Sequence, residues 1–581
     1  MHFFDREING RKIRVVAESV WDPVAKRSVA RQVNLGLVAA TDPVDLSQAR
    51  AQEQRAVGSV GALVWVAEKL EVVKRLNEGC GDVGAQGGPT VGEMVLAVAL
   101  QRVCEPGSKS ELSAFLEQSL ARPSCLAPSK YTVQAFHRLA SLVELDALDR
   151  AQLGIAKAAV AQFKLSADVL AFDSTNFDTH IATTTHSELA RRGHAKSKRS
   201  DLRVVGLGIL ASETGQVPLF HRAYAGNASD QCLLADCLSQ LGQLHDALDS
   251  AEDRRQPALR TLVRDGGFWS EQLELELDFE GYCSLISMPT SHRMAQVVLK
   301  EAAQRGAMKA LSGSLKDVRA FRKHVQFTTK DNMTLERTLV VYESQQLLDG
   351  QKRGIAAALK KAQLELKALE RRVKDGKVTQ SRLAQRVIQV LRREHLSSFV
   401  VTTIGGTQRQ PTFSWEIDPK ARRKFENTQL GKRVLCTDRH VWSTEKILSA
   451  FRSQWNVEEL FRRAKGGGIA PWGPSFLRAD SSLRLHTFAC VLGLTLVSLA
   501  RVALGSDLPI AAVMSRLSAI KATELSVPPK GRGRPTIHLL APVVDALQVE
   551  AIRIFELERW MPALASCRKP RRNAPKLEEC A

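Results

Sequence analysis

The sequence predicts an α/β protein with a mixed-sheet core, a helical N-terminal domain and a large α+β insertion. Residues 45–165 repeat apolar side chains at intervals of three and four, which is the period of amphipathic helices. From Asp168 onward, short apolar segments typical of strands alternate with helical ones, as a mixed sheet requires. After Met288, a long segment with a highly charged helix near 350–395 interrupts this alternation.

The length and charge of the chain limit the kinds of protein that it can be. With 581 residues it is too long for one compact core, so several domains are expected. Lys and Arg number 82 against 62 Asp and Glu, a net charge of +20. Such a surplus favours a polyanionic partner, nucleic acid first, through phosphate contacts and counterion release. A merely basic surface and an anionic membrane remain alternatives.

Cysteine usage and apolar runs bear on the compartment. The ten cysteines form no C-x-x-C pair and no zinc-ligand spacing, so reduced thiols in a cytosol fit best. The N-terminus has no apolar stretch typical of a signal peptide, and no export is expected. The longest apolar run, residues 488–500, is shorter than a bilayer span. We expect it to form a buried core helix.

The expected domains follow from these changes of pattern. A helix-turn-helix unit can lie within the helical N-terminal domain, although short helices joined by turns are common. The predicted order is a small β hairpin region at 1–40, a helical domain for DNA binding or oligomerisation at 41–165, a sheet core at 166–289 and 440–505, an insertion at 290–439, and a C-terminal helical region with a basic linker at 506–581.

Two aspartates follow predicted strands. Asp173 ends the apolar segment ADVLAF, and Asp265 ends TLVR before two glycines that permit a sharp turn. Taken singly, each is more often a turn or helix-cap residue. If their strands are neighbours, the two carboxylates converge, and converging carboxylates repel one another unless a cation such as Mg²⁺ or Mn²⁺ holds them.

A helix predicted from about 443 to 464 carries a third carboxylate. Phe451, Glu458 and Lys465 are spaced by seven residues and therefore share one helix face. Glu459 lies about 100° further round the helix, so Glu458 and Glu459 are not expected to face one metal site together. The alternative is an amphipathic helix with a solvated stripe of charges.

This set of residues resembles the bacterial insertion-sequence transposases of the DDE class. It is similar, more narrowly, to the superfamily whose third-carboxylate helix reads Y-x2-R-x3-E-x6-K. The segments KSKRSDLRVVGLGIL, GQVPLF, GNASDQ and WNVEELFRRAKGG resemble that family in order and setting, and the likeness covers about residues 165–505. Phe451 stands where Tyr is usual, and Gln454 where Arg is usual.

The resemblance implies a ribonuclease H-like core in which Asp173, Asp265 and Glu458 hold two divalent ions. It also implies a protein of the bacterial cytoplasm, near the nucleoid. Two such ions can activate the attacking oxygen and stabilise the leaving oxygen of a phosphodiester. The implied reaction cuts the terminal inverted repeats of a mobile element and joins their 3′-hydroxyls to target DNA, with two copies of the chain holding the two ends. The alternatives are a metal-dependent nuclease without strand transfer and an inactive DNA-binding protein derived from a transposase.

Several cations are candidate DNA contacts. The family likeness places Lys465 beside the scissile phosphate, and Arg462 lies on the same helix. A basic loop follows Asp173, and the four residues RGRP near the C-terminus match the core of an AT-hook, although a plain basic linker is the commoner explanation. The candidates in these two segments are Arg191, Arg192, Lys196, Lys198, Arg199, Arg532 and Arg534. The segment GNASD is expected to be a turn and helix cap.

Overall fold

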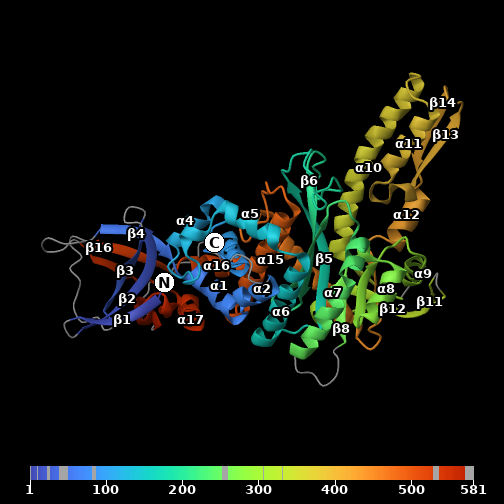
Figure 1. The fold of residues 1–581 in the computed structure, drawn as a ribbon. Helices are drawn as coiled ribbons and strands as arrows, with labels where there is room; N and C mark the ends of the chain where they lie inside the picture. The colour runs from blue at the N-terminus through green and yellow to red at the C-terminus, as the bar shows by residue number, and fades with distance from the viewer. Residues whose placement is uncertain are drawn as a thin grey trace. The chain divides into compact units, whose positions relative to one another are not determined.

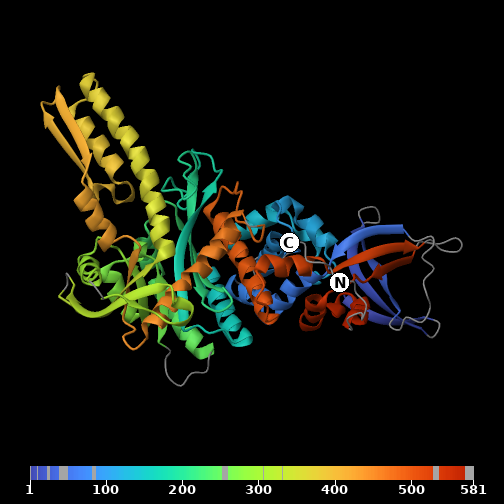
Figure 2. The same cartoon turned by 180° about the vertical axis from the view of Figure 1, so that it is seen from behind.

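The computed structural model of the chain contains two compact units. One unit comprises Met1–Arg260 with Ser453–Ala581, and the other Thr261–Arg452. Figures 1 and 2 show the ribbon from opposite sides. The structure describes residues 2–8, 11–22, 27–37, 50–80, 87–251, 259–304, 307–329, 332–466, 468–527 and 536–568.

In the first unit, helices fill the stretch whose apolar residues repeat at helical intervals. They are α1 (Gly58–Lys69), α2 (Val72–Cys80), α3 (Val91–Cys104), α4 (Leu112–Gln118), α5 (Val133–Leu142) and α6 (Leu145–Phe163). At the start of α3, Thr90 and Glu93 form a capping box, which satisfies two backbone N–H groups that the helix leaves unpaired.

Helix α15 (Asp480–Ala503) packs against α1, α3 and α5 and forms the centre of this helical core. It contains the apolar run 488–500. Among the described helices it is the one whose length and composition suit a membrane span, and 89% of its most apolar stretch is buried within the protein. Burial inside the protein is what the sequence predicts for this run.

Two small sheets contain the strands near the two ends of the chain, and one of them pairs strands from both ends. Strands β1 (His2–Ile8), β2 (Arg11–Asp22) and β3 (Arg27–Leu37) form an antiparallel sheet with one strand more than a hairpin. In a second sheet the strand order is β17 (Thr536–Leu540), β16 (Lys521–Val527), β4 (Arg50–Ala56).

For 506–581 the sequence predicts a helical region, and this prediction is wrong where the chain forms the strands β16 and β17. Helices α16 (Ile510–Ser518) and α17 (Ala546–Ile554) are present, but the chain between them pairs as strands. The partner of β16 is β4, far away in the sequence, and Arg55 forms an ion pair with Glu524 at 3.2 Å. A local pattern gives no sign of so distant a pairing partner.

An antiparallel meander of three strands follows the N-terminal helices: β5 (Val169–Thr179), β6 (Arg203–Ser212) and β7 (Pro218–Ala225). A Cβ placed at Gly208 of β6 would meet Leu233 of α7 (Asp230–Ala251), which identifies the face that α7 covers. Helix α14 (Gln454–Gly466) packs on β5 and β6, and α15 packs on β7. The meander is therefore covered by helices from distant parts of the chain.

The segment GNASD forms the predicted turn and cap between β7 and α7. Ala228 N–H donates to Ala225 O at 2.9 Å, and Ser229 Oγ accepts from Cys232 N–H at 3.3 Å. Gly226 N–H donates to Leu189 O, and the Gly226 backbone lies against the carbonyl group of Val204. No side chain fits at this position, so glycine is required by close approach of two backbones.

The second unit contains a sheet in the order β10 (Lys309–Ala310), β11 (Val318–Thr328), β12 (Thr334–Ser344), β15 (Lys432–Thr437), β9 (Tyr282–Met288), β8 (Arg260–Arg264). Helices α8 (Glu271–Phe279), α9 (Arg293–Ala302) and α13 (Thr444–Arg452) belong to the same unit. Strands β8 and β9 are separated in sequence by α8, which matches the alternation expected from the sequence.

The sequence predicts one insertion over 290–439, and the structure divides that stretch. Strands β12 and β15 pair with each other, and β15 pairs with β9, so both belong to the main sheet of the unit. The part with a core of its own lies between them. It consists of α10 (Gln345–Lys374), α11 (Gln380–Leu391), β13 (Val400–Gly406), β14 (Pro411–Ile417) and α12 (Pro419–Thr428), which lie together in both views (Figures 1 and 2).

The close approach at Gly226 makes a stability prediction. Gly226→Ala should lower the thermal unfolding midpoint by several degrees, because the new methyl group overlaps the Val204 carbonyl and such overpacking costs about 1–3 kcal/mol. Gly350→Ala, in α10 with open space around the position, is the control and should leave the midpoint unchanged or raise it. Equal midpoints for Gly226→Ala and the unaltered protein would contradict the backbone packing described for the turn.

Candidate active site

Asp173 lies within β5 and does not end it. The strand continues to Thr179, and Asp173 stands opposite Ile209 of β6. The sequence prediction that the strand stops at Asp173 is therefore wrong. The polar residues after Asp173 alternate with buried Thr175 and Phe177, and this alternation keeps the chain extended. Asp173 itself is half-buried and shares a sheet face with Phe177.

The basic loop between β5 and β6 folds back along β5. Asn176 fixes it at two points, because its Nδ2 donates to His194 O at 2.8 Å and its Oδ1 accepts from Lys196 N–H at 2.9 Å. Lys196 Nζ donates to Ser174 O at 2.5 Å. The ammonium group of Lys196 is thereby held against the residue that follows Asp173.

The remaining cations of this loop point to solvent. Arg191 forms a backbone bridge with Val204, while its side chain and those of Arg192 and Lys198 are exposed. Arg199 donates from Nε to Asp201 Oδ1 at 2.7 Å, and both side chains are more than half exposed. Arg532 and Arg534 lie outside the described residues.

The helix that carries Glu458 begins later than the sequence predicts. In place of one helix over 443–464, α13 ends at Arg452 and α14 starts at Gln454, with a turn at Ser453. Phe451 therefore stands on a different helix from Glu458, and the predicted face shared by Phe451 with Glu458 and Lys465 is wrong. Gln454, Glu458 and Lys465 remain on α14.

Two contacts fix how α14 runs along β5. Near the start of α14, Asn456 Nδ2 donates to Glu213 O at 2.8 Å, and Glu213 N–H donates to Val169 O, the first residue of β5. Near its end, Lys465 Nζ lies 5.9 Å from the centre of the Phe177 ring. The helix thus runs in the direction of the strand.

Glu458 lies between these two contacts along the helix, as Asp173 lies between Val169 and Phe177 along the strand. Glu458 also shares the face of Lys465, since seven residues bring a helix back to nearly the same direction. The first unit therefore brings Asp173, Glu458 and Lys465 to the same side of β5.

Glu458 and Glu459 have opposite surroundings. The Glu459 side chain is 8% exposed and forms an ion pair with Arg463 at 2.9 Å and another with Arg462. Arg463 is equally buried and also donates to Gln216 Oε1. Glu458 is exposed. Of the two neighbours, Glu458 has the carboxylate that is open to solvent, whereas Glu459 joins α14 to the rest of the unit.

Lys465 is exposed, but the protein around its ammonium group removes part of the hydration of that group. Burial lowers its pKa from the usual value, the Lys196 charge lowers the pKa further, and the carboxylates of Asp178 and Asp173 oppose this shift. The neighbouring Phe177 ring stacks on buried Trp472 at 4.9 Å between centroids. Two ammonium groups beside Asp173 form a place where an anion such as a phosphate can be bound.

In the second unit, Asp265 directly follows β8 and is exposed. It caps a short 3-10 turn, in which Phe268 N–H donates to Asp265 O at 3.1 Å. Asp265 thus has the strand-end position that the sequence predicts, together with the D-G-G turn given there as the alternative explanation.

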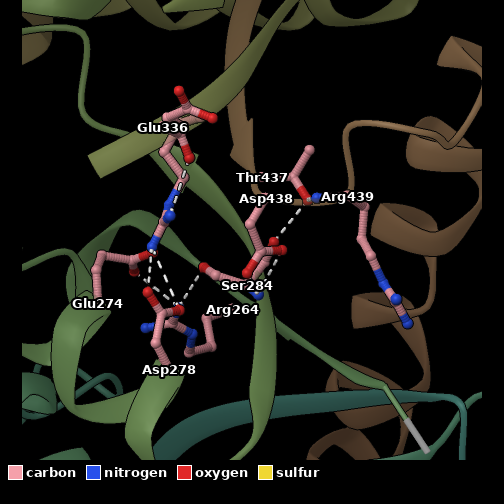
Figure 3. A network of polar contacts seen from close by, with 9 residues as sticks. Arg264, Glu274, Asp278, Ser284, Glu336, Thr437, Asp438 and Arg439 are labelled. Atoms are coloured by element: carbon pink, nitrogen blue, oxygen red, sulfur yellow. Dashed lines mark hydrogen bonds and ion pairs between the residues drawn. The ribbon is translucent and has the colours of Figure 1, made fainter. Parts of the chain in front are cut away.

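A buried network of charges surrounds the end of β8, the strand that Asp265 follows (Figure 3). Arg264, which is fully buried, donates from Nη2 to Glu274 Oε1 at 2.8 Å and to Ser284 Oγ at 2.6 Å. Arg337 of β12 forms an ion pair with Asp278 at 3.2 Å and approaches Glu274 at 3.8 Å. The network links β8 to α8, β9 and β12. In the sequence, the sign of this network is Arg264, a charged residue at the end of the otherwise apolar segment TLVR.

Asp438 lies at the other side of Ser284 in the same network (Figure 3). Both of its carboxylate oxygens accept from Ser284 N–H at 3.1 Å. Burial raises the pKa of Asp438 from 3.8 to about 6, while the charge of Arg337 and the Ser284 hydrogen bond act in the opposite direction.

Metal ligation is not evident from the side chains alone. Within the described residues, no group of three or more His, Cys, Asp or Glu side chains is arranged to hold a metal ion. Metal binding by Asp173, Asp265 and Glu458 therefore stays a prediction from the sequence.

Comparisons with known proteins give a distant likeness to solved structures. No family model matches the chain, and no curated protein matches it. A solved structure, the piggyBac transposase synaptic complex with hairpin DNA, is 9% identical and aligns over 79% of this chain and 78% of that chain with a TM-score of 0.35.

The contrast between Glu458 and Glu459 predicts that the same change to glutamine affects stability at one position and not at the other. Glu459→Gln should lower the thermal unfolding midpoint, because it leaves the buried Arg463 without its charge partner, at a cost of about 3 kcal/mol. Glu458→Gln changes an exposed side chain and should leave the midpoint within about 1 °C. A loss of the same size in both variants would show that the two side chains do not differ in this way.

The raised pKa of Asp438 predicts a pH effect with a definite sign. Since the folded protein holds this proton more tightly than the unfolded chain, the contribution of Asp438 to stability is greatest below about pH 4 and is lost as the pH rises through about 6. Asp438→Asn removes the ionisation, so its midpoint relative to the unaltered protein should be higher at pH 7.5 than at pH 5. Thermal unfolding at both pH values tests this, and a pH-independent difference would contradict it.

Proposed function

We propose that this chain is a DDE-class DNA transposase with a ribonuclease H-like catalytic core. The observation that carries the proposal is the surroundings of Asp173. It lies on β5 beside the ammonium groups of Lys196 and Lys465, under the helix that presents Glu458 to solvent. Carboxylates next to fixed cations suit a reaction at a phosphodiester, whose negative charge both metal ions and lysines stabilise.

Asp173, Asp265 and Glu458 are the proposed metal ligands. Their oxygen atoms fit the preference of Mg²⁺ or Mn²⁺ for hard donors, and both Asp265 and Glu458 are open to solvent in their own units. Two bound ions would supply activation of the attacking oxygen and stabilisation of the leaving oxygen. The family likeness of the segments around these residues supports the assignment, with Phe451 and Gln454 departing from the usual helix signature.

The chain's own cations bind and orient the DNA. Lys465, on the face of Glu458, contacts the phosphate beside the scissile bond, and Lys196 adds a second positive charge on the same side of β5. The exposed cations Arg191, Arg192, Lys198, Arg199 and Arg462 contribute affinity without reading sequence. Arg532 and Arg534 are further candidates for the minor groove.

The proposed partner is double-stranded DNA carrying terminal inverted repeats, together with target DNA. The helices of 58–163 serve DNA binding or association of two copies, because both ends of a mobile element must be held for joining. A metal-dependent nuclease without strand transfer is the second candidate, and it shares the same carboxylates. An inactive DNA-binding protein would bind the repeats and leave them uncut.

The decisive experiment is a cleavage and joining assay with Mg²⁺ and DNA ending in the inverted repeats that flank the gene. Asp173→Asn, Asp265→Asn and Glu458→Gln should each reduce cleavage by at least about 10³-fold and leave DNA binding nearly unchanged, because each removes a metal ligand and no phosphate contact. The control Asp236→Asn, at an exposed carboxylate on α7 in the first unit, should keep full activity.

The products separate the candidates. Joined products support the transposase, and cleavage without joining supports the nuclease. Binding of the repeats without cleavage in the unaltered protein supports the inactive DNA-binding protein. Substantial cleavage by any one of the three variants would rule out the proposed set of ligands.

A further inference from the structure

The positive charge of the chain is concentrated in one part of the second unit. Residues 345–430 contain 18 Lys and Arg against eight Asp and Glu, a net charge of +10, which is half of the +20 of the whole chain. These residues form α10, α11, α12 and the hairpin of β13 and β14. We call this part the basic subdomain.

The apolar side of the basic subdomain is already in use. Along α10, Ile355, Ala362, Leu366 and Leu369 are buried in a core shared with α11, β13 and α12. Among the described residues of α10, Leu364 is the one large apolar side chain that is exposed, with 66% of its surface accessible to solvent. Leu364 lies on the outer face of α10, away from this core, and the other exposed side chains of the helix are polar or alanine.

Cations form a stripe along that outer face. Arg353, Lys360, Lys367 and Lys374 follow one another at intervals of seven residues, and all four are exposed. Such spacing places them in nearly one line, with steps of about 10 Å and a total length of about 31 Å. Lys374 pairs with Glu370 at 3.4 Å, where both side chains are more than a third exposed, so this pair competes weakly with another anion. We call these four residues the α10 stripe.

We propose that the α10 stripe binds the phosphate backbone of duplex DNA without sequence preference. A linear row of like charges suits a linear polyanion, and about 31 Å is close to one helical turn of B-form DNA. An anionic membrane fits less well, because a helix that lies on a membrane inserts an apolar face, and α10 has buried that face in the subdomain core.

This surface adds a second DNA contact to the proposed function and rests on that function for the identity of the polyanion. It lies on α10 and contains none of the proposed metal ligands. Binding at the stripe is therefore measurable without cleavage, in the absence of divalent ions.

The experiment measures the affinity of the full-length chain for a duplex of about 30 base pairs without inverted repeats, over a series of salt concentrations in EDTA. The stripe variant carries Arg353→Gln, Lys360→Gln, Lys367→Gln and Lys374→Gln, and glutamine preserves helix propensity. Its slope of log K against log salt should fall by about 3 to 4, with binding at least about tenfold weaker at 0.1 M salt.

The matched control removes four exposed cations of the same unit outside the basic subdomain: Arg293→Gln, Lys300→Gln, Lys309→Gln and Lys316→Gln. It changes the net charge equally and should keep the slope. A variant with only Lys360→Arg and Lys367→Arg keeps the charge of the stripe and should bind as the unaltered protein does. Thermal unfolding midpoints of the variants equal to that of the unaltered protein exclude misfolding.

Equal losses in the stripe and control variants would overturn the proposal, because total charge would then explain the binding. An unchanged slope in the stripe variant would also overturn it. The same holds if the stripe variant loses binding to phosphatidylserine vesicles but still binds the duplex as the unaltered protein does. The outcome of the cleavage assay is independent of this binding test. Cleavage by Asp173→Asn protein would overturn the catalytic proposal without changing the conclusion about DNA binding by the α10 stripe.

Discussion

The candidate site depends on the packing of α14 against β5. Helix α14 alone is a short charged segment, and its carboxylates have no fixed position until the helix is anchored. The hydrogen bond of Asn456 with the chain beside the start of β5 and the contact of Lys465 with Phe177 supply two anchors, and the buried pair of Glu459 with Arg463 supplies a third. Glu458 is among the side chains of α14 that these contacts leave exposed. The burial of its neighbour thus determines which of two adjacent glutamates is available for chemistry.

A different kind of interaction supports Asp265. Arg264, Glu274 and Arg337 are buried charges, and burying charges costs free energy unless each is paired. Such a network adds little to net stability, but it tolerates few alternative arrangements, because a displaced partner leaves an unpaired ion in the interior. The residue that follows Arg264 is Asp265. The network therefore limits the movement of the strand end at which that carboxylate is exposed.

The two groups of cations that we propose to contact DNA differ in how their charges are arranged. In the first unit, Lys196 and Lys465 are individually fixed by Ser174 and Phe177, and their closeness to each other and burial lower the pKa of Lys465. On α10, by contrast, the cations are regularly spaced along one helix. Two cations held beside one carboxylate suit the binding of one phosphate in one geometry, whereas a regular row suits a long polyanion in many registers.

The sequence by itself determined the helices of 58–163, the strands around Asp173 and Asp265, the turn at Gly226 and the burial of the run 488–500, because each depends on a local repeat of apolar residues or on one turn. Its prediction that β5 stops at Asp173 and that one helix joins Phe451 to Glu458 was wrong, since neither the continued pairing with β6 nor the turn at Ser453 is visible in local patterns. Only the tertiary structure decided that β16 pairs with β4, that β12 and β15 belong to the main sheet, and that Glu459 is buried while Glu458 is exposed. The physical reason is common to all three: the partners are distant in the sequence, and their contacts form only when the chain has folded.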